Sequence, residues 1–188
     1  MYKLCKTEQS AARQRELELG LLQMMALKRY EDITISDLCQ RMQIPRKSFY
    51  RYFSSKDGAL FALLDHTMLE FFEMSFRQQQ NRSALKELEN FFQFWYHHKE
   101  LLDALERSQL SGILVERATA LAQREHLFPQ RMKSWPAELQ GVAISFAICG
   151  LMSMVISWHH QGYPVGPSDM TRTATILLTQ PLLQRDPL

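Results

Sequence analysis

The chain has 188 residues, of which 46% are hydrophobic and 11% aromatic, enough apolar material for a buried core and too much for a disordered chain. The net charge is only +2, but residues 1–57 hold 11 Lys and Arg against 7 Asp and Glu. This local positive excess is typical of a segment that meets a polyanion. The three cysteines fit no disulfide or metal spacing, which favours reduced thiols and a cytoplasmic protein.

The pattern of apolar residues predicts an all-α fold. Apolar side chains recur at intervals of three and four, and glycine is scarce. Capping residues and prolines give the approximate bounds of the helices. We expect helices over 8–28, 35–42, 84–98, 99–107, 111–125 and 137–160. Three further helices are expected to begin at Pro45, at a capping box between Ser54 and Asp57, and at a Ser168 cap.

One segment has the length of a membrane span. From Leu139 to Trp158 there are 20 residues without a formal charge. However, Gln140 and several serines interrupt the segment, and no basic cluster flanks it. We therefore favour a buried helix or a dimer-interface helix over a membrane span.

The most informative stretch runs from Thr34 to Lys56. It predicts a short helix headed by Thr34, a tight turn, and a second short helix. Residues 44–56 include four basic residues and no acidic one. A helix-turn-helix places such a second helix in the major groove, where basic and hydroxyl side chains contact phosphates and bases. An ordinary solvated pair of basic helices is the alternative on charge alone.

Three runs in this stretch resemble the N-terminal signature of the TetR/AcrR family of repressors. They are ITISDLC at 33–39, SFYRYF at 48–53 and SKD at 55–57, and the most specific spacing joins Phe49, Tyr50, Tyr52, Phe53 and Lys56. The resemblance covers roughly residues 8–75. The remaining 110 residues or so resemble the family only in helix count and apolarity.

The resemblance implies an all-α regulator with a three-helix helix-turn-helix DNA-binding domain over 1–57 and a helical ligand-binding and dimerisation domain over 58–188. It implies a phosphate-binding Thr34 at a helix N-terminus, exposed recognition-helix positions, a Lys56 that faces phosphate, and a core role for Phe49 and Phe53. The DNA-binding residues that we expect are Thr34, Arg46, Lys47, Ser48, Tyr50, Arg51, Tyr52 and Lys56.

The sequence also departs from the family pattern. Gln43 stands where the turn usually has glycine, and a positive φ there would cost about 1 kcal/mol, which favours a turn of different shape. Pro45 replaces a side-chain cap, Lys47 replaces a residue that is often glycine, and Ala59 stands where a large aliphatic residue is common. These changes bear on the operator sequence more than on DNA binding.

The C-terminal part suggests a ligand pocket and a dimer interface. An aromatic-rich helix faces the long apolar helix, so a pocket for a small apolar or amphipathic effector is expected at Phe91, Phe92, Trp95, Met152 and Trp158, although a plain core is the alternative. The resemblance implies a homodimer through the last two helices. Small residues on the long helix would permit close approach there, at Ala143, Ala147, Gly150, Ser153 and Ser157.

Other candidate sites are weaker. His97-His98 and His159-His160 are adjacent pairs whose members diverge on a helix, so structural or pocket-lining roles are expected in place of a metal site. Cys149 is expected to be a core thiol. We find no catalytic motif, so no enzyme, metal or cofactor is expected. The interpretation is a TetR-like repressor that an effector releases from a double-stranded DNA operator. The alternative is a helical protein-interaction module that does not read DNA.

Overall fold

The computed structural model describes residues 2–3, 5–77, 83–124 and 134–180. Most of these residues are helical, which confirms the expected all-α fold. A 3-10 turn over Tyr30–Asp32 precedes the second α-helix. The α-helices of the described residues are α1 (Glu8–Met25), α2 (Ile35–Arg41), α3 (Arg46–Tyr52), α4 (Lys56–Arg77), α5 (Ala84–His97), α6 (Lys99–Arg107), α7 (Ser111–Arg124), α8 (Ala137–His160) and α9 (Pro167–Thr179).

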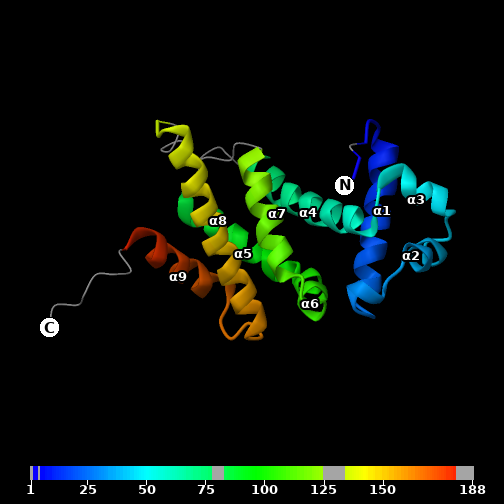
Figure 1. Ribbon diagram of the computed structural model, residues 1–188. Helices are drawn as coiled ribbons and strands as arrows, with labels where there is room; N and C mark the ends of the chain where they lie inside the picture. Colours follow the sequence, from blue (N-terminus) through cyan, green and yellow to red (C-terminus); the bar gives the residue numbers. More distant parts are fainter. Residues whose placement is uncertain (1, 4, 78–82, 125–133, 181–188) are drawn as a thin grey trace.

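The molecule has two parts joined by one helix (Figure 1). Helices α1–α3 form a group at one end, called the head below, and α5–α9 form the body. Helix α4 runs from the head into the body and packs on α1, α5 and α7. The division into domains at residue 57 stays a prediction, because α4 contributes buried residues along its length.

The head is held together by apolar faces of short helices. Thr7 caps α1, its hydroxyl accepting from the Ser10 N–H at 3.2 Å. Gly20 permits α1 to approach the C-terminal end of α2. A β-carbon at this position would lie only 2.4 Å from the sulfur of Met42, the C-cap of α2. Six side chains of the inner face are at most 1% exposed: Leu17, Leu21, Met25, Leu38, Phe49 and Phe53.

The start of α4 differs from the expected capping box by one residue. The Ser55 hydroxyl, not that of Ser54, caps the helix by accepting from the Gly58 N–H at 3.0 Å. This register buries both Ala59 and Leu60, at 0% and 1% exposure. Sequence alone cannot choose between two adjacent serines, because both precede an acidic or small residue at a workable spacing.

The body is built from two helix pairs. Helix α7 packs along α8, and α5 packs along α9. The last helix begins at Pro167, with Gly166 as N-cap, two residues before the start expected from a Ser168 cap. Proline suits the first helical turn because its missing N–H has no partner there. Helix α5 buries Phe91, Phe92, Phe94 and Trp95, whereas Leu85 near its start is 53% exposed.

Helix α8 is apolar but mostly uncovered. Within the described residues it is the one helix long and apolar enough to cross a membrane by length and composition, which alone is weak evidence. Its inner face packs on α6 and α7 and buries Met152, Val155 and Trp158. Its outer face exposes Val142 and Phe146, at 68% and 73%. Cys149 is exposed as well, so the expected core role for this thiol is wrong.

Candidate nucleic-acid interface and ligand cavity

The N-terminus of α2 is fixed by a reciprocal cap. The Thr34 hydroxyl accepts from the Asp37 N–H at 3.1 Å, and the Asp37 carboxylate accepts from the Thr34 N–H at 3.0 Å. The Lys28 ammonium donates to the same carboxylate at 2.9 Å. The backbone bond from Thr34, followed by the bond from Lys28, lowers the pKa of Asp37 to about 2. Thr34 is exposed, so this end of α2 is rigid and accessible.

The turn between α2 and α3 takes a left-handed conformation in spite of its glutamine. Gln43 has a φ of +52°, a value that glycine adopts without strain. The Ile44 N–H then donates to the Cys39 carbonyl at 2.9 Å, which closes the turn. The differently shaped turn that Gln43 suggested is not observed.

Helix α3 separates an inner aromatic face from an outer basic face. Phe49 is fully buried, and its ring lies 5.2 Å from that of Phe53. Arg46 and Tyr50 lie one turn apart on the outer face, and the Arg46 guanidinium approaches the Tyr50 hydroxyl at 3.4 Å. The residues of α3 that are exposed are Arg46, Lys47, Tyr50 and Arg51, and Ser48 is half-buried.

Tyr52 belongs to the inner side of the head. It is 8% exposed, in contrast to the other expected DNA-binding residues of α3. Its carbonyl accepts from the Lys3 N–H at 3.0 Å, and Tyr2 forms a β-bridge with Phe53. The N-terminal segment is therefore anchored beside the end of α3.

Lys56 is placed differently from the phosphate-facing role that the resemblance implies. Its ammonium donates to the carbonyls of Tyr30 and Ile33, each at 2.6 Å, and reaches that of Glu31 at 3.4 Å. It also lies 4.1 Å from the centre of the Tyr30 ring. Burial lowers the pKa of Lys56. Since an ammonium has three N–H donors, Lys56 uses them to clamp the α1–α2 loop onto α4.

Further polar contacts join the head to the body. The Ser108 hydroxyl, in the turn between α6 and α7, accepts from the buried Tyr30 N–H at 2.9 Å. The neighbouring Arg107 donates to the Ala26 carbonyl after the last turn of α1. The α6–α7 turn is thus attached directly to the head. The partners in the head are backbone groups, the Tyr30 N–H and the Ala26 carbonyl, which no side-chain pattern in the sequence marks.

The five residues of the expected ligand pocket form a packed aromatic cluster. Phe91, Phe92, Trp95, Met152 and Trp158 are all 8% exposed or less. The Phe92 ring lies 5.3 Å from that of Phe91 and 6.1 Å from that of Trp158. These side chains fill the space between α5 and α8, as in the plain-core alternative.

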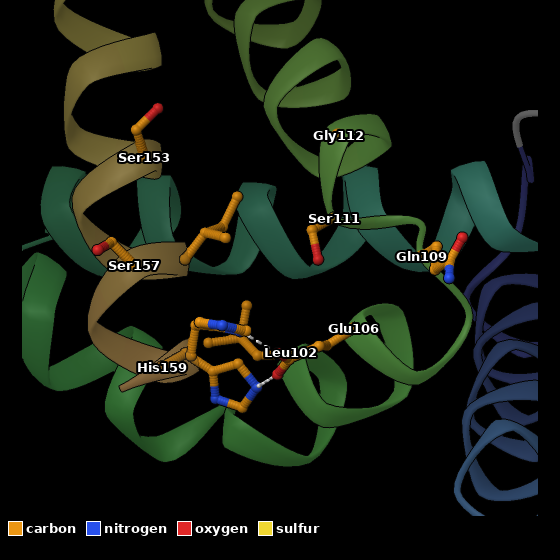
Figure 2. A pocket seen from close by; sticks show the side chains of 10 residues that line it. Leu102, Glu106, Gln109, Ser111, Gly112, Ser153, Ser157 and His159 are labelled. Atoms are coloured by element: carbon orange, nitrogen blue, oxygen red, sulfur yellow. Dashed lines mark hydrogen bonds and ion pairs between the residues drawn. The ribbon is translucent and has the colours of Figure 1, made fainter. Parts of the chain in front are cut away.

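A cavity of about 550 Å³ lies elsewhere, between α6, the start of α7 and the last turns of α8 (Figure 2). None of the five expected pocket residues lines it. Its apolar wall includes Leu102 and Ile156, and its polar end brings Glu106 of α6 against His159 and His160 of α8. The other lining residues are Gln109, Ser111, Gly112, Ser153 and Ser157.

The outer face of α8 holds the small residues expected at a dimer interface. Gly150, Ser153 and Ser157 are exposed, whereas Ala143 and Ala147 are half-buried. Large apolar side chains extend the same exposed face, and the sequence analysis had not included them. Their recurrence every three to four residues was the signal that could have found them, at Leu139, Val142 and Phe146.

Comparison with known proteins identifies the fold. No protein-family model and no curated protein matches the sequence. The fatty acid degradation regulator FadR from Bacillus halodurans aligns with a TM-score of 0.59 at 14% identity, over 97% of this chain and 100% of FadR. The dihydroxyacetone kinase operon activator DhaS aligns with a TM-score of 0.57 at 16% identity, over 88% of this chain and 93% of DhaS.

A transcriptional regulator of the TetR/AcrR family from Thermobifida fusca aligns less well, with a TM-score of 0.46 at 18% identity, over 93% of this chain and 100% of that one. The alignments with FadR and DhaS span nearly the whole chain and therefore include both head and body. This protein therefore shares the fold of FadR and DhaS, a head of short helices followed by a helical body.

Proposed function

We propose that the protein is a cytoplasmic transcriptional regulator that binds an operator in double-stranded DNA as a homodimer and changes its DNA affinity when a small effector enters the body. We further propose that it is a repressor, which the effector releases. Helix α3 enters the major groove, and Thr34 at the exposed start of α2 contacts phosphate. Lys56 is excluded from this surface because its donors are occupied within the chain.

The observation that carries the proposal is the outer face of α3. Three cationic side chains, Arg46, Lys47 and Arg51, are exposed together with Tyr50 on a helix of seven residues. The first turn of this helix contains no acidic residue. Such a face attracts phosphates, and its tyrosine and serine hydroxyls can bond to phosphates or base edges.

The test is an electrophoretic mobility shift titrated with salt. DNA affinity should fall steeply as salt rises, and Lys47→Ala should reduce the slope of log affinity against log salt by about one unit. The matched control is Lys86→Ala in α5, whose side chain is 51% exposed but lies on the body. An unchanged slope in Lys47→Ala, or no salt dependence in the wild type, would favour the protein-interaction module instead.

The homodimer is proposed to form through the outer faces of α8 and α9. Phe146 is 73% exposed on α8, and Ile176 and Leu178 are 45% and 46% exposed on α9. Large exposed apolar side chains of this kind are typical of a protein–protein interface. Two copies joined there would give two recognition helices for two half-sites, about 34 Å apart on the DNA.

A substitution on each side of the molecule tests the dimer. Phe146→Glu should give monomers in sedimentation velocity, because a charge would be buried without a partner. The control Leu27→Glu changes an equally exposed residue, 74% against 73%, at the end of α1 and should stay dimeric. Dimers of unchanged affinity in Phe146→Glu would place the interface elsewhere.

A further inference from the structure

The polar end of the cavity groups a carboxylate with two histidines. The His159 side chain, 7% exposed, has its Nε2 atom 2.8 Å from one Glu106 oxygen and 3.4 Å from an Asp103 oxygen. Its other ring nitrogen pairs with the Tyr163 hydroxyl at 2.9 Å. The second Glu106 oxygen contacts His160. Figure 2 shows Glu106 and His159 converging from α6 and α8.

One atom of this group lacks a hydrogen bond. Within the described part of the chain, Nε2 of His159 is buried and has no hydrogen-bond partner, so its close contact with Glu106 is not aligned as one. If the proton on Nδ1 is donated to Tyr163, the Nε2 lone pair faces a carboxylate oxygen. Two acceptors this close are unfavourable unless a donor bonds to both.

With its two histidines neutral, the cavity lining carries one charge, that of Glu106. Glu106 is the only acidic residue among the lining residues, and no lysine or arginine is among them. Hydrogen bonding from His160 holds the pKa of Glu106 below its ordinary value, so the carboxylate stays ionised at neutral pH. Leu102 and Ile156 add apolar surface beside this polar group, one helical turn from Glu106 and from His159.

We propose that this cavity is a binding site for a small amphipathic amine. Its ammonium group donates to the Glu106 carboxylate and to Nε2 of His159, and its apolar part packs on Leu102 and Ile156. An ammonium supplies a permanent positive charge, and no lysine or arginine lines the cavity. A fatty acid carboxylate would meet the negative charge of Glu106 and is excluded as the occupant.

The position of the cavity also links it to the head. Glu106 and Gln109 line it, and the two residues between them, Arg107 and Ser108, bond to Ala26 and Tyr30 of the head. An amine that shifts this turn must therefore change the contacts that orient the head. This regulatory step rests on the proposed function, whereas binding of the amine does not.

The binding test compares three probes with the same alkyl chain, hexylamine, hexanol and hexanoate, by isothermal titration calorimetry at neutral pH. Hexylamine should bind most tightly, and hexanoate should bind at least about tenfold more weakly. Glu106→Gln should weaken hexylamine about tenfold and leave hexanol unchanged, whereas Glu100→Gln, an exposed position on the same helix, should change neither. Equal affinity for hexanoate, or full affinity in Glu106→Gln, would overturn the proposal.

A second variant tests the site without touching its charge. A side chain added at Gly112 of α7 meets no atom within 4 Å, and this residue lines the cavity. Gly112→Leu should therefore fold normally and abolish hexylamine binding by filling the space. Gly141→Leu, equally unobstructed but away from the cavity, is its control. Hexylamine binding that survives Gly112→Leu would also overturn the proposal.

The link to the head is tested by the mobility shift in the presence of hexylamine. Saturating hexylamine should change the DNA affinity of the wild type, and Ser108→Ala, which deletes the bond to Tyr30, should bind hexylamine equally but show a smaller change. Hexylamine that binds at Glu106 without changing DNA affinity would overturn the regulatory step. If the protein binds no DNA, the proposed function fails, while the calorimetric result on the amine site stands.

Discussion

Replacing Arg117 should show how strongly the body is attached to α4. Asp65 of α4 is fully buried, and the Arg117 guanidinium of α7 bonds both of its oxygens, with the Nε–Oδ1 distance at 2.9 Å. The Tyr2 hydroxyl donates to the same carboxylate at 2.7 Å. Removing one partner of a buried ion pair costs about 3–5 kcal/mol, because the remaining charge is uncompensated. Since Tyr2 still bonds to Asp65, we expect the lower end, about 3 kcal/mol, for Arg117→Met.

The assay is urea unfolding followed by circular dichroism at a fixed protein concentration, together with the thermal midpoint. A loss of about 3 kcal/mol corresponds to a fall of roughly 6–12 °C for a chain of this size. Adding Asp65→Asn to Arg117→Met should recover most of the loss, because the buried charge is then absent. Arg13→Met breaks an ion pair that is 44% and 54% exposed and should cost less than about 1 kcal/mol. Equal losses in Arg117→Met and Arg13→Met would refute the reasoning.

Three further variants test other features. Gln43→Gly should stabilise the protein by about 0.5 kcal/mol or more in urea unfolding, because it relieves a φ of +52°; destabilisation would mean that the glutamine side chain has an unrecognised role. Lys56→Ala should cost about 2 kcal/mol of stability and leave the salt slope of DNA binding unchanged, so a smaller slope would restore its phosphate role. Burial, with the bond to Asp65, raises the pKa of Tyr2 from 10.0 to about 12. The native state therefore holds this proton more tightly, and the wild type should lose stability between pH 10 and 12 more steeply than Tyr2→Phe.

Local signals in the sequence predicted most helix bounds. The capping box of Thr34 and Asp37 is formed as expected, and the bounds 99–107 and 137–160 agree with α6 and α8. These features depend on residues a few positions apart, so a single sequence contains the necessary information. The one-residue difference at Ser55 shows the limit where two caps compete.

The functional surfaces were only partly predictable, because they depend on contacts between distant segments. Lys56 bonds to backbone carbonyls of another loop, which no side-chain pattern encodes. The aromatic residues around Phe92 suggested a pocket, but their rings fill the space that a ligand would need. The actual cavity was missed although the His159-His160 pair had been noted, because Glu106 lies far from it in sequence.

The seven-residue helices α2 and α3 have a consequence for hybrid regulators. Helices this short are not stable alone and depend on the tertiary packing around them. Their support includes Leu60 of α4 and the Ser108 hydroxyl of the α6–α7 turn. A chimera cut at residue 57 would leave these supports in the discarded half. Exchanging operator specificity between regulators of this fold therefore calls for replacing the outer residues of α3 alone, and not for transplanting the head.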